Sequence, residues 1–210
     1  MMILCKYQVV IILITDRDNE VIKQWFEPYK FASISQIEKS FFRNQQNSYE
    51  IARRRLCAMV SDGFLKLYRD DVGRRSIYML NIKNVTPPSP HRMITLDVLA
   101  EMRYCGFNVE FYGIEKQWLD GQIRSDAFTI FTVKNRRYHF FIEVQTANNY
   151  HRLDKYDTLK ASGEVQKLLN KNFFPRILFI SDTKYTDLHI NSTEIIQLDT
   201  QLNMFPSILV

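Results

Sequence analysis

The feature of this sequence that most constrains its fold is an apolar stretch, Tyr138 to Gln145, that carries a carboxylate near its end. In YHFFIEVQ both alternating sets of side chains contain aromatic or aliphatic residues, which is typical of a central strand buried on both faces. Glu143 and Gln145 lie on one of these faces, at positions i and i+2. A carboxylate there is costly unless it is paired, hydrogen-bonded, protonated or bound to a metal. The rest of the fold must therefore supply Glu143 with a partner.

A second apolar run, Ala127 to Val133, precedes this stretch and begins directly after Asp126. The segment Asn135 to Arg137 separates the two runs by a turn, so we predict a β-hairpin. The pairing of its strands can bring Asp126 to the same end of the sheet as Glu143. Because carboxylate oxygens are preferred ligands of Mg²⁺, the pair predicts a site for a divalent metal.

Composition places the chain among globular proteins, because 46% of its residues are hydrophobic and 24% are charged. Three scattered cysteines give neither a disulfide framework nor a zinc pattern, so we expect a cytoplasmic protein. The apolar run Val9 to Ile14 is too short to span a membrane, and we expect no membrane partner. We interpret this run as part of a buried first helix.

The positive charge is concentrated in the first half of the chain. Residues 1–91 contain 14 Lys and Arg against 9 Asp and Glu, whereas residues 92–210 contain 14 of each. The whole net charge of +5 therefore belongs to the first 91 residues. A basic module beside a neutral one predicts that the first half meets a polyanion.

The first half has the periodicity of short helices followed by a hairpin. We predict helices over 7–14, 20–26, 35–42 and 48–62, a turn at 44–47, and strands Leu65–Arg69 and Ser76–Leu80 joined by a tip at 70–75. A capping box, Ser35 with Glu38, is expected to open the third helix, and Ser48 is expected to cap the fourth before Gly63 ends it. The expected buried face of the fourth helix consists of Tyr49, Ala52, Leu56 and Met59. Arg53 and Arg54 point away from that face, and Arg55 lies at its margin.

The order helix, helix–turn–helix, hairpin resembles a winged-helix domain over roughly residues 4–83. The resemblance implies that Ser48 to Asp62 is a recognition helix, which lies in the major groove of double-stranded DNA. The DNA-contacting residues that it implies are Ser48, Arg53, Arg54, Arg55, Lys66, Arg74 and Arg75, the last two at the tip of the wing. Two other interpretations stay open: the arginines are an ordinary solvated face, or the domain binds protein, as some winged helices do.

Three prolines between Val85 and Pro90 predict a stiff linker, and we place the domain boundary there. The domains are then a winged helix at 1–84, a proline-rich linker at 85–91 and a second domain at 92–210. In the second domain we predict helices at 93–104 and 150–169, the latter disturbed at Gly163, and strands at 107–113, 127–133, 138–145, 177–181 and 194–198. This order predicts an α+β or α/β domain with a mixed sheet and helices on both faces.

The second domain resembles the PD-(D/E)xK nuclease fold, on the residues Ser125-Asp126 and Glu143-Val144-Gln145. After Gln145 come a helix rich in lysine and tyrosine, with Arg152 to Tyr156 at its start, and then a strand, Phe174 to Asp182. On these residues most of the chain resembles the plasmid replication-relaxation family, in which a winged helix precedes such a domain. Gln145 stands where an active nuclease usually has lysine, and no proline precedes Asp126. Lys155 or Lys160, on the following helix, can supply the missing cation.

The resemblance implies a DNA-binding protein of a plasmid or other mobile element that acts in DNA replication or relaxation or its control. Its nuclease-like domain is then a scaffold for homodimer formation or DNA clamping, and other replication or mobilisation proteins are expected partners. The alternative is a Mg²⁺-dependent endonuclease. There Asp126 and Glu143 hold the metal, Gln145 orients water or phosphate, and Lys155 stabilises the developing charge. A third hypothesis is an adaptor that binds only protein.

Overall fold

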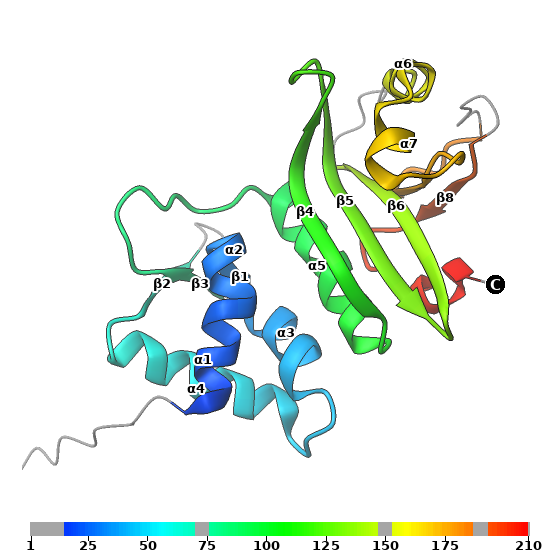
Figure 1. Ribbon diagram of the computed structural model, residues 1–210. Helices are drawn as coiled ribbons and strands as arrows, with labels where there is room; N and C mark the ends of the chain where they lie inside the picture. Colours follow the sequence, from blue (N-terminus) through cyan, green and yellow to red (C-terminus); the bar gives the residue numbers. More distant parts are fainter. Residues whose placement is uncertain (1–14, 70–75, 147–152, 187–192, 210) are drawn as a thin grey trace, which may run out of the picture. The chain divides into compact units, whose positions relative to one another are not determined.

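The computed structural model describes residues 15–69, 76–146, 153–186 and 193–209 (Figure 1). The predicted first helix, the hairpin tip with Arg74 and Arg75, and residues 150–152 lie outside these ranges. The chain divides into two compact units, Met1–Pro87 and Pro88–Val210. The division falls inside the proline-rich segment 85–91. No helix in the described part of the chain is long and apolar enough to cross a membrane.

The first unit is a set of short helices with a small antiparallel sheet. Its elements are α1 (Asp16–Val21), η1 (Ile22–Phe26), α2 (Glu27–Tyr29), β1 (Phe31–Ser33), α3 (Ile34–Ile37), η2 (Glu38–Phe42), α4 (Ser48–Ser61), β2 (Leu65–Arg69) and β3 (Ser76–Leu80). Strands β2 and β3 have the predicted bounds and pair antiparallel, from Leu65 opposite Leu80 to Arg69 opposite Ser76. The short β1 pairs with β3 on its other side and was not predicted.

The helix predicted to stop before Pro28 continues through it. Elements α1, η1 and α2 form one uninterrupted helical segment from Asp16 to Tyr29. A π-helical turn precedes the proline, and in it the N–H of Glu27 donates to the carbonyl of Ile22. Pro28 therefore lies in the last turn, and no helix follows it that its missing N–H could interrupt. The segment ends at Lys30, which has a left-handed φ of 74°.

The predicted caps of α3 and α4 are wrong. Helix α3 is capped by Ser33, whose Oγ accepts from the N–H of Gln36 (3.2 Å) while Gln36 Oε1 accepts from the N–H of Ser33 (2.9 Å). The N-cap of α4 is Asn47 with a φ of 58°, and Ser48 Oγ donates instead to Glu38 Oε1 (2.7 Å). On α4 the predicted burial of Ala52, Leu56 and Met59 is confirmed, and Ala58 is buried with them. The predicted burial of Tyr49 is wrong, because its side chain is 47% exposed.

The second unit is built on a five-stranded mixed sheet in the order β4-β5-β6-β7-β8. Its elements are α5 (Pro90–Tyr104), β4 (Asn108–Trp118), β5 (Ile123–Val133), β6 (Arg136–Gln145), α6 (Lys155–Ser162), α7 (Glu164–Leu169), β7 (Arg176–Ser181), β8 (Ile195–Leu198) and η3 (Phe205–Leu209). Strand β5 pairs antiparallel with β4 and with β6, and β6, β7 and β8 run parallel.

Helices cover both faces of this sheet, as predicted. On one face α5 packs against the first three strands, with Met102 Sδ 3.9 Å from Thr129 Oγ1. The opposite face is covered by α6 and α7, and there the ring of Tyr156 lies 4.8 Å from that of Phe141 (Figure 1). The strand β6 is therefore buried on both faces, which confirms the prediction from its two apolar sides.

Several boundaries in this unit differ from the sequence prediction. Strand β4 continues to Trp118 instead of ending at 113, and β5 begins at Ile123 instead of 127, so that Asp126 lies within β5 and does not precede it. Helix α5 begins at Pro90 instead of Met93, because Ser89 caps it through the N–H of Arg92 (3.3 Å). The β5–β6 turn is Lys134-Asn135 rather than 135–137, and both residues have left-handed φ angles. Helix α6 begins at Lys155, and the predicted break at Gly163 is confirmed by its left-handed φ of 70°.

Candidate functional site

The pairing of β5 with β6 places Asp126 beside the end of β6, as the sequence predicted. Ala127 lies opposite Ile142, and one residue further on Asp126 Oδ2 accepts from the backbone N–H of Val144 at 2.8 Å. The Asp126 side chain thereby accepts a backbone N–H of β6 beyond Ala127–Ile142, the last regular residue pair between β5 and β6. Because Glu143 immediately precedes Val144, the two carboxylates belong to one cluster at this end of the sheet.

Glu143 is fully buried in this cluster, and the segment after β6 supplies its partners. Lys155 Nζ lies 2.9 Å from Glu143 Oε1, and the hydroxyl of Tyr156 donates to the same oxygen. The Lys155 ammonium also donates to the backbone carbonyl of Arg124 at 2.9 Å. The buried carboxylate is thus held by a cation and a hydroxyl from adjacent residues at the start of α6.

Tyr156 remains protonated in this setting. Burial is the main cause that raises the pKa of its hydroxyl well above the usual value of about 10, and the neighbouring Glu143 carboxylate adds to the effect. A neutral phenol is a hydrogen-bond donor, and Glu143 is the acceptor. From the sequence, Tyr156 was expected only as part of a helix rich in lysine and tyrosine, not as a partner of Glu143.

Asp126 has a partner of its own, His91, which lies at the end of the predicted linker 85–91. His91 Nε2 lies 2.8 Å from Asp126 Oδ1. The hydrogen bond with Asp126 is the main cause that raises the pKa of His91; burial opposes it, and the charges of Asp126, Glu143 and Glu115 reinforce it. The sequence does contain a pattern that could have predicted this position of His91. Ser89-Pro90, a capping residue followed by proline, indicates that α5 begins at Pro90, which puts His91 in the first turn of the helix.

The other predicted members of the site have distinct places. Gln145 is buried at the end of β6, opposite Ser181 of β7, and by alternation shares a face with Glu143. Lys160 donates to Thr193 Oγ1 at 3.3 Å. Lys155, one of the two lysines that the sequence proposed, contacts Glu143.

The donor set does not fit a divalent metal in this arrangement. Both oxygens of Asp126 already accept, from His91 and from Val144, and Glu143 Oε1 accepts from Lys155 and from Tyr156. The described residues contain no group of three or more His, Cys, Asp or Glu side chains placed to hold a metal. Lys155 and His91 already bind the two carboxylates, and a metal would have to displace both.

In the first unit the predicted DNA-contacting residues separate into two groups. Arg53 and Arg54 are exposed on α4, and Arg53 pairs at the surface with Glu50 at 2.9 Å. The others bond within the protein. Arg55 binds the buried Asp18, Lys66 Nζ donates to the carbonyl of Val85 (3.3 Å), and Ser48 is engaged with Glu38. Arg74 and Arg75 lie outside the described residues.

Comparison of the chain with protein-family models, with curated proteins and with solved structures finds no match. The function is therefore inferred from the chain's own residues.

Proposed function

We propose that the first unit is a winged helix that binds double-stranded DNA, and that the protein is a DNA-binding factor of a plasmid or other mobile element. It would act in DNA replication or relaxation or in their control. In the same proposal the second unit has the PD-(D/E)xK nuclease-like fold and serves as a scaffold for a homodimer, for DNA clamping, or for other replication or mobilisation proteins.

The observation that carries this proposal is the exposed pair Arg53 and Arg54 on α4. This helix packs against α3 and η2 and is followed directly by the β2–β3 hairpin, which is the order of a helix–turn–helix with a wing. Adjacent exposed arginines on such a helix suit phosphates and guanine edges. The net positive charge of residues 1–91 supports the same partner, because it favours any polyanion.

Duplex binding at several salt concentrations tests the proposal. The double variant Arg53→Ala/Arg54→Ala should bind labelled duplex more weakly, and the slope of log K against log salt should fall by about 1.8 if each arginine contacts one phosphate. The matched control is Lys23→Ala/Lys83→Ala, which removes two exposed cations of the same unit from other segments. If the control variant loses as much duplex affinity and both variants are folded, α4 is not the recognition helix.

A second candidate function is that of a metal-dependent DNA endonuclease. This function is favoured by Asp126 and Glu143, which lie close together on adjacent strands, and by Lys155, which contacts Glu143. In that function Lys155 and His91 must first leave the two carboxylates. Cleavage of supercoiled plasmid with Mg²⁺ or Mn²⁺, lost in Asp126→Asn and in Glu143→Gln, would support it. If the wild type leaves the plasmid intact with either metal, the endonuclease function is rejected.

A further inference from the structure

The opposite end of the β5–β6 hairpin carries a second group of basic and aromatic residues. The turn consists of Lys134 and Asn135, with left-handed φ angles of 47° and 63°, which is the geometry of a tight two-residue hairpin turn. Such a turn fixes the direction of the chain on both sides. Lys134 and Arg136 are therefore held exposed at the tip of a rigid hairpin.

Two hollows flank this tip, and Tyr138 lines both. The first, of about 580 Å³, is lined by Cys105, Phe107, Val133, Lys134, Arg136, Tyr138, Pro206 and Leu209. The second, of about 420 Å³, lies across Tyr138 and includes Arg137, His139, Phe173 and Arg176. Each is large enough for a group of the size of a nucleotide.

The aromatic rings of these hollows are fixed by their neighbours. Tyr138 stacks on Phe131 at 5.5 Å and 17°, and Phe131 stacks in turn on Phe107 at 5.2 Å and 9°. Phe173 is 44% exposed and meets the ring of His139 edge-on at 5.1 Å. A planar ligand that stacks on Tyr138 or Phe173 would thus meet a ring whose orientation is already set.

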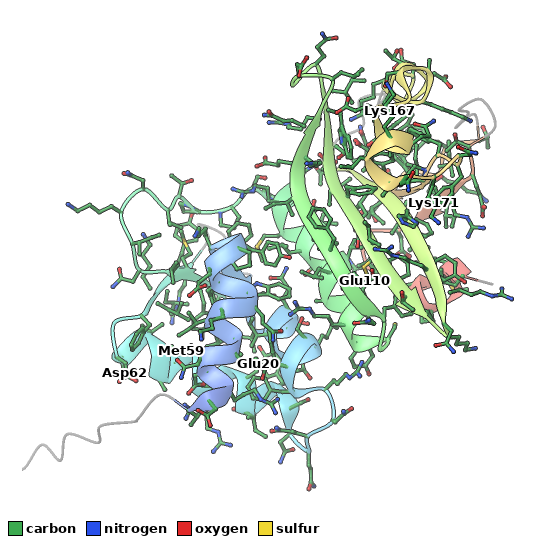
Figure 2. All side chains as sticks on the ribbon, viewed as in Figure 1. Glu20, Met59, Asp62, Glu110, Lys167 and Lys171 are labelled. Carbon is green, nitrogen blue, oxygen red and sulfur yellow. The ribbon has the colours of Figure 1, made fainter. Side chains whose placement is uncertain are left out.

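Cations outnumber carboxylates around the rings. The cations are Lys134, Arg136, Arg137, Lys171 and Arg176, and the carboxylates are Glu110, paired with Arg137 at 2.7 Å, and Glu194, paired with Arg176 at 2.8 Å. Figure 2 labels Glu110 and Lys171 on this unit. Burial is the main cause that lowers the pKa of His139; Arg137 and Lys171 lower it further, and Glu110 opposes them. The surplus positive charge makes this surface suited to an anion.

We propose that this hairpin-tip surface binds single-stranded DNA. Cations beside the exposed ring of Phe173 and the half-buried ring of Tyr138 match a ligand that offers phosphates and unstacked bases in alternation. The bases of a duplex are stacked on one another and leave no face for Phe173 or Tyr138. The proposal goes beyond duplex binding by the first unit and does not depend on it, because all the residues that carry it belong to Pro88–Val210.

The test is fluorescence anisotropy of the full chain with a short labelled oligothymidine and with a duplex of the same length. We expect Phe173→Ala to weaken oligothymidine binding roughly tenfold through lost stacking. Lys134→Ala/Arg136→Ala should lower the salt slope by about 1.4, which corresponds to two phosphate contacts on a single strand. Arg53→Ala/Arg54→Ala should leave oligothymidine binding unchanged, so that failure of either proposal can be told from failure of the other.

The matched control is Arg124→Ala/Lys184→Ala, two exposed cations at the other end of the sheet. It should bind oligothymidine like the wild type. The inference is overturned if the wild type does not bind oligothymidine, if the control loses as much as Lys134→Ala/Arg136→Ala, or if Phe173→Ala is without effect. It is also overturned if Phe173→Ala weakens duplex and single strand equally. Unchanged thermal melting of each variant shows that the losses concern binding.

Discussion

Glu143 and Lys155 form a pair whose members are buried to different degrees, and this difference makes a prediction. The side chain of Glu143 is 0% exposed and that of Lys155 is 24% exposed. Lys155→Met leaves a buried carboxylate without its cation and should cost about 3–5 kcal/mol of unfolding free energy. Glu143→Gln should cost less, because the lysine can turn toward water.

Urea denaturation checks this ranking, with Lys160→Met on the same helix as the control for losing a lysine. The double variant Glu143→Gln/Lys155→Met should be more stable than Lys155→Met alone, since neither member of the pair then carries a charge. A double variant no more stable than Lys155→Met would show that the ion pair does not decide the stability of this cluster.

The pair His91–Asp126 predicts how stability changes with pH. The pKa of His91 is raised in the folded protein, so its contribution is fully present below the ordinary value of about 6.5 and is lost as pH rises through the folded-state pKa. The difference in urea midpoint between the wild type and His91→Gln should therefore shrink from about pH 6 into the alkaline range. His139, whose pKa is lowered, has the opposite effect, but it is the same in both proteins and cancels. A difference that is constant or grows with pH would contradict the prediction.

At this scale the sequence predicted that Glu143 needs a partner, because a buried carboxylate in a strand is costly without one, and it placed a lysine, Lys155 or Lys160, at the same site. It did not find Tyr156 or His91. Tyr156 has no spacing that distinguishes it from a core tyrosine, and His91 precedes the strand of Asp126 by about thirty residues. Their contacts arise from how α5 and α6 pack on the sheet, which local patterns do not contain.

Among the elements, β2, β3 and β7 were predicted closely, whereas β1 was missed and β4 and β5 are longer than predicted. Strand β2 follows from alternation between apolar and polar residues, β3 from its place as the second strand of the hairpin, and β7 from a short apolar run directly after Pro175. The start of α3 was ambiguous because Ser33 with Gln36 and Ser35 with Glu38 both have capping-box spacing. Burial of Ser33 and Gln36 selects the first pair, and burial is a tertiary property.

The two overlapping boxes give a matched pair of substitutions. Ser33→Ala should lower the stability of the first unit by about 1 kcal/mol, because the N–H of Gln36 loses its acceptor at a buried helix end. Ser35→Ala should change it by less than about 0.5 kcal/mol, since it removes no cap. Thermal denaturation of both variants is the measurement, and a larger loss in Ser35→Ala would restore the cap that the sequence favoured.

For the whole molecule, the sequence indicated two modules through the prolines of 85–90 and through the change in charge at residue 91. The structure divides the chain at Pro87, and each unit has its own buried residues. What the sequence could not supply is the pairing order of the second sheet. Parallel pairing of β6 with β7 joins strands about thirty residues apart, so no short-range pattern encodes it.

Two cores predict two separate unfolding transitions in calorimetry of the full chain. Leu56 is fully buried in the first unit and Ile142 in the second, and either change to Ala should cost about 2–5 kcal/mol. Leu56→Ala should lower one melting temperature by about 10 °C or more and leave the other in place, and Ile142→Ala should do the reverse. The isolated segment 1–88 should also fold, although a unit of this size buries only about 60% of its surface and is marginal. If both substitutions instead lower one common transition, the units unfold together, and a variant of one would disturb binding by the other.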